Sequence, residues 1–197
     1  AGASGTTVAL AGNTLTVTNG TTTIASVMSG VGGAFTVRGT ATTTLTAANT
    51  YSGATDVAEN ANLTIAAGAS VAGAVNTSDS GVTTNDGTIF GTETTSGDGS
   101  FTNNHSVNAV VHNGGTTTNA GVIVTSLDVN ADGTTNTATG TVNGDVTVDG
   151  GKLINHGTLG DAAADTVTVG ATGKLDTDLM VKSAVVNDGA VRAEGDI

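Results

Sequence analysis

Short stretches of the chain place apolar side chains at every second position. Leu15 and Val17 alternate with threonines, and Phe35 and Val37 flank Thr36 in the same way. An apolar period of two residues predicts a β-strand with one buried face. The helix formers Leu, Lys and Glu are scarce, and no stretch sustains the 3.6-residue period of an amphipathic helix. We therefore predict an all-β chain that turns its apolar side chains inward and its threonines outward.

Units made of a strand and a glycine turn recur along the chain. Residues 146–153 and 167–175 share a Val-Thr-Val strand, a glycine turn and an apolar residue that begins the next strand, and residues 63–71 have a similar layout. The first two units lie about 21 residues apart. Repeats of about 20 to 25 residues indicate a β-solenoid, whose coils stack about 4.8 Å apart. We expect about nine or ten coils from a chain of 197 residues.

Asparagines followed by glycine within two positions form a second series. Asn and Gly tolerate positive φ, which suits the sharp corners between the sides of a coil. Asparagines that occupy one corner in successive coils can also stack as a hydrogen-bonded ladder. We therefore predict a structural role for these corners and not a catalytic one. The asparagines of the series are Asn85, Asn113, Asn119, Asn143, Asn155 and Asn187.

The domain organisation is simple. We find no domain boundary and expect residues 1–197 to form a single solenoid. Residues 77–108 are less regular and are expected to form a loop region that projects from it. Because the sequence begins with Ala1 and Gly2 instead of Met, we expect a processed or excised part of a longer exported protein.

The composition separates a solenoid from other classes. Charged residues make up 11% and apolar residues 37%, which is too little charge and too much apolar content for a disordered chain. Aromatic residues make up 2%, whereas a β-sandwich of this length fills its core with larger side chains. The thin layers of a solenoid need only Val, Ile, Leu and Ala. Composition therefore favours a solenoid over a sandwich.

The charge argues against two kinds of partner. The net charge is −12, and the five basic residues are scattered along the sequence. Nucleic acid and anionic membrane surfaces are not expected partners, because there is no basic patch in the sequence to meet their phosphates. No apolar run approaches the roughly 18–20 residues that span a bilayer, so we expect no direct membrane insertion. The basic residues are Arg38, Lys152, Lys174, Lys182 and Arg192.

The stretch from residue 45 to residue 63 resembles a known repeat. It is similar to the passenger-associated β-strand repeat of bacterial autotransporter passenger domains, whose pattern runs L-x-G-x-N-T-Y-x-G-x-T-x-V-x-x-G-x-L. Ala47 and Asn60 stand where that pattern has glycine. The matching residues are Leu45, Asn49, Thr50, Tyr51, Gly53, Thr55 and Val57, and Leu63 corresponds to the final leucine of the pattern after one additional residue.

The resemblance implies a fold, a location and a role. The fold would be a right-handed parallel β-helix, and the location extracellular or on the bacterial cell surface. The parent protein would carry an outer-membrane β-barrel translocator. The role would be non-enzymatic and would consist of adhesion, autoaggregation or biofilm formation through extended Thr- and Asn-rich faces. Partners would be further copies of the chain, or proteins or glycans on host or bacterial surfaces.

A structural filament subunit is an alternative to the surface protein. Uniform coils without site chemistry also suit end-to-end stacking, in which exposed strand edges complete one another's ladders. The two hypotheses differ in the surface that associates, since a filament uses its ends and an adhesin uses its sides.

A polysaccharide-acting enzyme is the weaker alternative, because parallel β-helices include such enzymes. Their sites combine clustered carboxylates with Arg or Lys. Four aspartates invite this interpretation, but a solvated acidic face explains them more simply, and we expect no catalytic residue. The four are Asp145, Asp149, Asp161 and Asp165.

One segment matches half of a calcium-binding loop. Asp128, Asn130 and Asp132, followed by Gly133, give the D-x-N-x-D-G pattern of alternating oxygen ligands. The twelfth position is Thr139 in place of the bidentate Glu. A turn is the commoner explanation in a chain rich in Asp, Asn and Gly, so we expect no cofactor and keep calcium as the alternative.

The three histidines do not suggest a metal site. Without cysteine, such a site would need carboxylates in a geometry that the sequence does not show. We interpret His105, His112 and His156 as solvated or turn residues.

Overall fold

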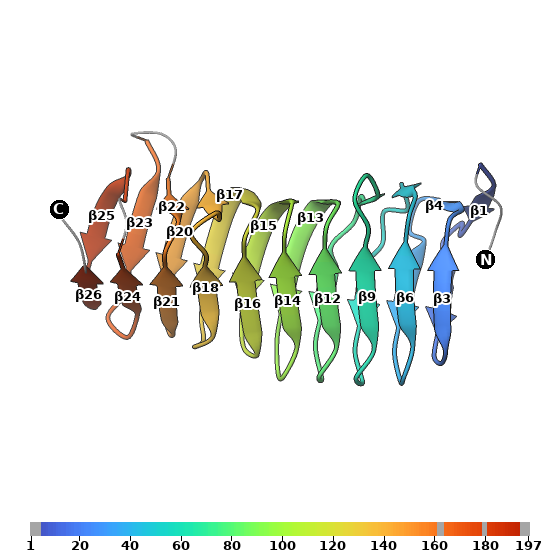
Figure 1. Cartoon of the computed structure of the whole chain (residues 1–197), viewed down its shortest axis with the longest axis horizontal. Helices are drawn as coiled ribbons and strands as arrows, with labels where there is room; N and C mark the ends of the chain where they lie inside the picture. Colours follow the sequence, from blue (N-terminus) through green and yellow to red (C-terminus); the bar gives the residue numbers. More distant parts are fainter. Residues whose placement is uncertain (1–4, 161–163, 179–180, 194–197) are drawn as a thin grey trace.

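The computed structural model describes residues 5–160, 164–178 and 181–193. Its regular elements are all β-strands, every pair of neighbouring strands is parallel, and the chain winds through about ten turns. Figure 1 shows the coils stacked side by side along one axis, with the two termini at opposite ends. The prediction of an all-β solenoid is confirmed. In these residues there is no helix long and apolar enough to cross a membrane.

One side of the solenoid is a sheet of ten strands, here called sheet 2. Each strand comes from a different coil, so this sheet runs the length of the stack, as the row of arrows in Figure 1 shows. Its strands are β3 (Thr21–Ile24), β6 (Thr42–Leu45), β9 (Asn62–Ile65), β12 (Val82–Asn85), β14 (Ser100–Asn103), β16 (Thr116–Asn119), β18 (Thr134–Asn136), β21 (Lys152–Asn155), β24 (Lys174–Thr177) and β26 (Ala190–Ala193).

A second side, here called sheet 1, is formed by ten further strands that also pair from coil to coil. Three of them, β13, β15 and β17, are long enough to bend around a corner and continue on the third side. The strands are β2 (Thr14–Val17), β5 (Ala34–Val37), β8 (Thr55–Val57), β11 (Val75–Thr77), β13 (Thr88–Thr95), β15 (Ser106–His112), β17 (Val122–Val129), β20 (Asp145–Val148), β23 (Thr166–Val169) and β25 (Ala184–Asn187).

The third side is less regular and consists of short strands together with the first residues of β13, β15 and β17. Its separate strands are β1 (Thr7–Ala9), β4 (Val27–Ser29), β7 (Ala48–Asn49), β10 (Ser70–Val71), β19 (Thr141–Val142) and β22 (Thr158–Leu159).

The coils stay in register although their lengths differ. Val146 pairs with Val167, which confirms the 21-residue repeat between these two units. Residues 63–71 do not occupy the equivalent place: their first strand is β9 in sheet 2, whereas residues 146–148 belong to sheet 1. The step between paired residues is 16 from Thr102 to Thr118 and 22 from Lys152 to Lys174. Turns therefore absorb the differences in length, while the strands keep their partners.

The core is a stack of apolar side chains inside the coils. Phe35 and Val37 are fully buried on either side of the half-buried Thr36, as the alternation predicts. The largest fully buried side chains are Tyr51, Phe35 and Phe101, and the rest of the core is mainly Val, Leu, Ile and Ala. Burying apolar surface at about 25 cal/mol per Å² is the main favourable contribution to the stability of such a core.

Threonine is not confined to the outside, and here the prediction was wrong. In Thr42-Thr43-Thr44 only the middle residue is fully buried. The hydroxyl groups of Thr77 and Thr83 form a hydrogen bond with each other inside the core, with their oxygens 2.8 Å apart. Threonine can enter the interior because its methyl group packs like that of valine and its hydroxyl can bond to a neighbouring hydroxyl, although the buried hydroxyls of Thr43 and Thr134 have no hydrogen-bond partner. The buried threonines are Thr43, Thr55, Thr77, Thr83, Thr95, Thr117, Thr134 and Thr177.

Residues 77–108 also differ from the expectation of a projecting loop. They contain β12, β13 and β14, and four-residue or shorter turns connect these strands. The alternation was hidden in the sequence because several inward side chains here are polar, including Thr83, Asn85 and Glu93. The segment therefore forms ordinary coils.

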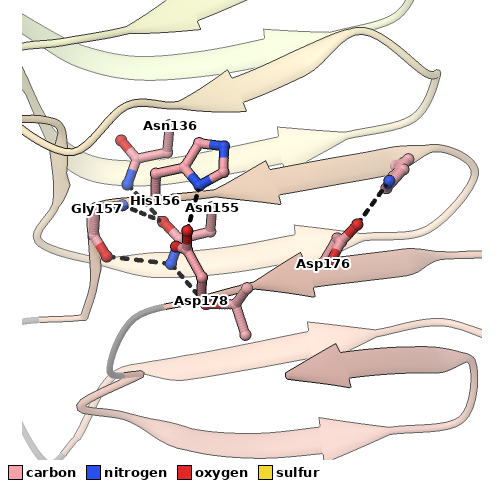
Figure 2. A network of polar contacts seen from close by, with 8 residues as sticks. Asn136, Asn155, His156, Gly157, Asp176 and Asp178 are labelled. Atoms are coloured by element: carbon pink, nitrogen blue, oxygen red, sulfur yellow. Dashed lines mark hydrogen bonds and ion pairs between the residues drawn. The ribbon is translucent and has the colours of Figure 1, made fainter. Parts of the chain in front are cut away.

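A ladder of buried asparagines runs along the end of sheet 2. Each side-chain amide nitrogen donates to the amide oxygen in the next coil at 2.7–2.8 Å. The last one, Asn155, donates to the hydroxyl of Thr177 at 3.0 Å. Figure 2 shows its C-terminal part, where Asn136 points toward Asn155. The ladder consists of Asn85, Asn103, Asn119, Asn136 and Asn155, the last strand residues of β12, β14, β16, β18 and β21.

The predicted ladder is therefore present, but the asparagines that form it are only partly those of the predicted series. Asn85, Asn119 and Asn155 belong to the Asn-Gly series, whereas Asn103 and Asn136 lack a glycine within two positions. The amides also donate to backbone carbonyls at the start of the next strand, such as that of Ser106, the first residue of β15. The ladder thus adds hydrogen bonds at the corner and helps to fix the register of sheet 2 from within.

Replacing Asn119 with alanine should lower the free energy of unfolding by about 2–4 kcal/mol, because a buried hydrogen-bond partner is lost in both directions. The Asn136 amide oxygen loses its donor and the Asn103 amide nitrogen loses an acceptor. Urea unfolding of the purified variant measures the change.

The control is Asn104→Ala, which removes an exposed amide that donates to Asp86 at 2.8 Å. It should cost about 0.5 kcal/mol or less. Equal losses for the two variants would show that the buried ladder has no special role in stability.

Candidate functional site

The outer face of sheet 2 carries an unbroken row of threonines. The row takes one residue from each of seven consecutive coils, and each is the direct cross-strand partner of the next. Neighbouring strands lie about 4.8 Å apart, so the hydroxyl and methyl groups repeat at that interval. We call these residues the threonine row: Thr23, Thr44, Thr64, Thr84, Thr102, Thr118 and Thr135.

A second row of short side chains lies beside the threonine row on the same face, two residues earlier in each strand. Thr116 donates from its hydroxyl to Ser100 at 3.0 Å, a direct bond between neighbouring coils. Short side chains in both rows leave this face without a ridge over six coils. The second row consists of Thr21, Thr42, Asn62, Val82, Ser100 and Thr116.

The character of this face changes at β21, where basic residues begin. Lys152 is the direct cross-strand partner of Lys174, and Arg192 is the partner of Asp176. Three of the five basic residues, which are scattered in the sequence, are therefore gathered at one end of sheet 2. Their separations of 22 and 18 residues fall near one coil length, and this was the signal available in the sequence.

Two acidic side chains at this end have basic partners. The Lys152 amine lies 2.8 Å from the carboxylate of Asp176, and this hydrogen bond holds the pKa of Asp176 below its ordinary value. The exposed His156 Nδ1 lies 2.8 Å from the carboxylate of Asp178. Figure 2 shows both contacts beside the end of the asparagine ladder.

A groove of about 520 Å³ opens between the threonine rows and the basic end. Thr134 pairs with Thr117 in one neighbouring coil and with Leu153 in the other, so Gly133 falls between Thr116 and Lys152. The second row thus lacks a side chain at this one coil, and the groove lies there. Gly133 has a φ of 113°, and a Cβ at this position would lie 2.3 Å from the carbonyl oxygen of Gly115. Glycine is therefore required by the backbone itself.

The groove is lined by residues from four coils. They are Thr116, Thr118, Asp132, Gly133, Thr134, Thr135, Lys152, Ile154 and Lys174.

Inside the solenoid, Glu93 is fully buried. Burial raises the pKa of Glu93 to about 8, although the hydroxyl groups of Thr95 and Thr77 act in the opposite direction. The carboxyl group is therefore protonated and uncharged at neutral pH. The sequence analysis missed this residue because a single Glu within a threonine-rich stretch gives no sign of burial.

A chain of hydrogen bonds joins Glu93 to His112. Thr95 Oγ1 lies 2.9 Å from Glu93 Oε2 and 3.0 Å from Thr117 Oγ1, which lies 2.9 Å from His112 Nδ1. His112 Nε2 lies 3.0 Å from the Asp132 carbonyl oxygen. The interpretation of His112 as a solvated or turn residue was wrong, since it is fully buried.

The direction of these hydrogen bonds follows from the carbonyl oxygen of Asp132, which can only accept a hydrogen bond. His112 therefore carries a proton on Nε2, and a neutral ring then accepts at Nδ1 from Thr117. Thr117 then accepts from Thr95, and Thr95 can accept from a protonated Oε2 of Glu93. Each of these bonds then has one donor and one acceptor, whereas Glu93 Oε1 is buried without a hydrogen-bond partner.

The residues of the repeat motif have structural places. Leu45, Val57 and Leu63 belong to the core. Tyr51 is fully buried, its hydroxyl is hydrogen-bonded to Thr55, and burial raises its pKa to about 12.

The polar and glycine positions of the motif connect adjacent coils. Asn49 accepts from the Met28 amide and donates to the Ser70 carbonyl, while Thr50 is exposed. A Cβ on Gly53 would lie 2.4 Å from the carbonyl oxygen of Gly33 in the preceding coil, so the close approach of two coils requires glycine here.

The half-matching calcium loop is divided between two environments. Asp128 lies on the outer face of β17, where burial and the charge of Asp149 raise its pKa. Asn130 donates to Asn113 at 3.0 Å, and Asp132 is exposed at the rim of the groove. Within the described ranges, no three His, Cys, Asp or Glu side chains gather as metal ligands.

The other candidates are dispersed. His105 Nδ1 lies 3.0 Å from the Gly87 carbonyl oxygen, at a turn as expected. Asp145 accepts from the amide and the hydroxyl of Thr166. Asp149 follows β20 and lies near Asp128, while Asp161 lies outside the described residues.

Comparisons of the chain with protein-family models, curated protein sequences and solved structures gave no match.

The state of Glu93 predicts how stability depends on pH. Its pKa is about 8 when folded and near the ordinary value of 4.5 when unfolded, so the folded state holds the proton more tightly. Its contribution to stability is then complete below about pH 4.5 and is lost as the pH rises through 8. Glu93→Gln keeps a donor toward Thr95 but cannot ionise. The variant should therefore gain stability relative to the natural chain between pH 5 and 9, by several kcal/mol in total.

Urea unfolding at a series of pH values measures this difference. If the stability curves of the natural chain and the variant run parallel from pH 5 to pH 9, folding does not raise the pKa of Glu93 and this account is wrong.

Proposed function

We propose that this solenoid is a non-enzymatic extracellular protein that attaches cells to surfaces or to one another through the outer face of sheet 2. The observation that supports this proposal best is the threonine row, which presents the same side chain from seven consecutive coils. The resemblance of residues 45–63 to autotransporter passenger repeats supports the extracellular location.

Attachment through such a face is distributed over many side chains. Each threonine offers one hydroxyl donor and acceptor, together with a methyl group, and a single hydrogen bond of this kind contributes about 0.5–1.5 kcal/mol. A partner that matches the repeat can engage many of them together, and the affinities then multiply. Loss of one threonine should matter little, whereas a block of like charges should matter much.

Filament assembly by end-to-end stacking is the second candidate, and one observation favours it. Val185 and Val191 occupy inward positions, as the partners of the buried Val167 and Leu175, yet they are 45% and 40% exposed. The last described coil thus presents apolar side chains that a further coil would cover, from this chain or from a second copy.

The attachment hypothesis predicts that Thr23→Glu, Thr64→Glu and Thr102→Glu together abolish cell clumping when the chain is displayed on bacteria. Three charges on the threonine row repel a like face and leave carboxylates unpaired, so the clumped fraction should fall about tenfold or more. Sedimentation of the displaying cells measures the clumped fraction, and circular dichroism of the purified variant verifies the fold.

The matched control is Thr16→Glu, Thr94→Glu and Thr168→Glu on the outer face of sheet 1, which adds the same charge to one exposed and two half-buried strand positions. Clumping should persist in this variant. Equal loss of clumping in both variants would reject a role specific to sheet 2.

The filament hypothesis predicts a different sensitivity. Val185→Lys with Val191→Lys should reduce axial assembly, because two charges would be buried at the junction. Light scattering and electron microscopy of the purified chain measure assembly. If clumping survives in the Val185→Lys, Val191→Lys variant but is lost when glutamates replace Thr23, Thr64 and Thr102, attachment through the outer face of sheet 2 is favoured.

A further inference from the structure

The groove on sheet 2 combines positive charge with hydroxyl groups in a chain of net charge −12. Lys152 and Lys174 form one wall, and Arg192 lies on the following strand, β26. Like charges directly opposite each other in neighbouring strands are unfavourable by themselves. A site that places them together gains from an anion that binds between them.

The two lysines differ in how far their charge is satisfied. The carboxylate of Asp176 lies 2.8 Å from the Lys152 amine. Lys174 is exposed, and no carboxylate of the described residues lies within ion-pair distance of its amine. The charge of Lys174 is thus available to a ligand that enters the groove.

The rest of the lining suits a sugar ring. Thr116, Thr118 and Thr135 offer hydroxyl groups that can donate to and accept from sugar hydroxyls. Ile154 contributes an apolar surface at the end of the threonine row, in direct register with Thr135. A pyranose carries both kinds of surface, since its hydroxyls lie around the edge and its C–H groups on the faces.

We propose that this groove binds a carboxylate-bearing polysaccharide, with a uronate carboxylate at Lys174 and the sugar ring over Ile154 and the neighbouring threonines. The chain of sugars continues along the threonine row, whose repeat lets it extend over several coils. This inference deepens the proposed function and rests on it, since it names a partner for the same face.

The negative charge of the chain modulates this binding without preventing it. Asp132, at the rim, is the carboxylate among the residues that line the groove, and it forms neither of the two ion pairs at this end of the sheet. At physiological salt the Debye length is about 8 Å, so the acidic residues of distant coils are screened. Asp132 is then the main opposing charge, and its removal should strengthen binding.

The test measures binding of polygalacturonate to the purified chain by calorimetry, at about 50 mM and about 200 mM salt. Lys174→Gln should weaken binding by about threefold to fivefold, the size expected from one solvent-exposed ion pair. Asp132→Asn should tighten it by about twofold, because it removes a like charge. Binding should weaken at the higher salt concentration.

Lys182→Gln is the matched control, since it removes the same charge from an exposed position beside Val181 on the third side. It should bind as the natural chain does, and an uncharged galactan should bind at least about threefold more weakly than polygalacturonate. Absence of polygalacturonate binding, or equal weakening by Lys174→Gln and Lys182→Gln, would overturn the proposal.

A second copy of the acidic chain is the competing occupant of the groove. If Lys174→Gln alters the sedimentation of the pure chain and leaves polygalacturonate binding unchanged, the groove is a contact between copies and the proposal is wrong. The polymer is tested without cells, so this inference can fail while attachment through the threonine row persists.

Discussion

The structure depends on in-register stacking of coils that differ in length. The asparagine ladder shows how register is kept: from Asn85 to Asn155 one amide follows another at 2.7–2.8 Å, although the steps along the chain range from 16 to 19 residues. A shift of one residue would turn these amides outward and the threonine row inward, leaving buried polar groups without partners. The register of the strands therefore determines both the buried asparagine ladder and the exposed threonine row.

The fold could be predicted because the same sequence pattern of strands and turns recurs in successive coils of a solenoid. Alternation such as Phe35-Thr36-Val37 defines the strands, and asparagines mark the corners. The direction of each threonine could not be predicted in the same way. In Thr42-Thr43-Thr44 the three residues are chemically identical, and only pairing with neighbouring coils decides that Thr43 points inward.

The candidate site was harder to predict from the sequence than the fold. Lys152, Lys174 and Arg192 come together only when the lengths of the intervening coils are known. The buried path from Glu93 to His112 likewise needs the register of two sheets, because it crosses the interior through Thr95 and Thr117. Sequence patterns predict which residues are in strands, whereas surface chemistry depends on which coil lies beside which.

A distance along the threonine row tests the register on which both surface and core depend. The chain has no cysteine, so spin labels can be attached specifically at Thr44→Cys and Thr135→Cys. These positions are 91 residues apart in sequence but separated by five strand spacings, or about 24 Å, on the outer face of sheet 2. Double electron–electron resonance should give a narrow distribution near that distance. A broad distribution, or a much longer distance, would contradict the aligned row and the function proposed for it.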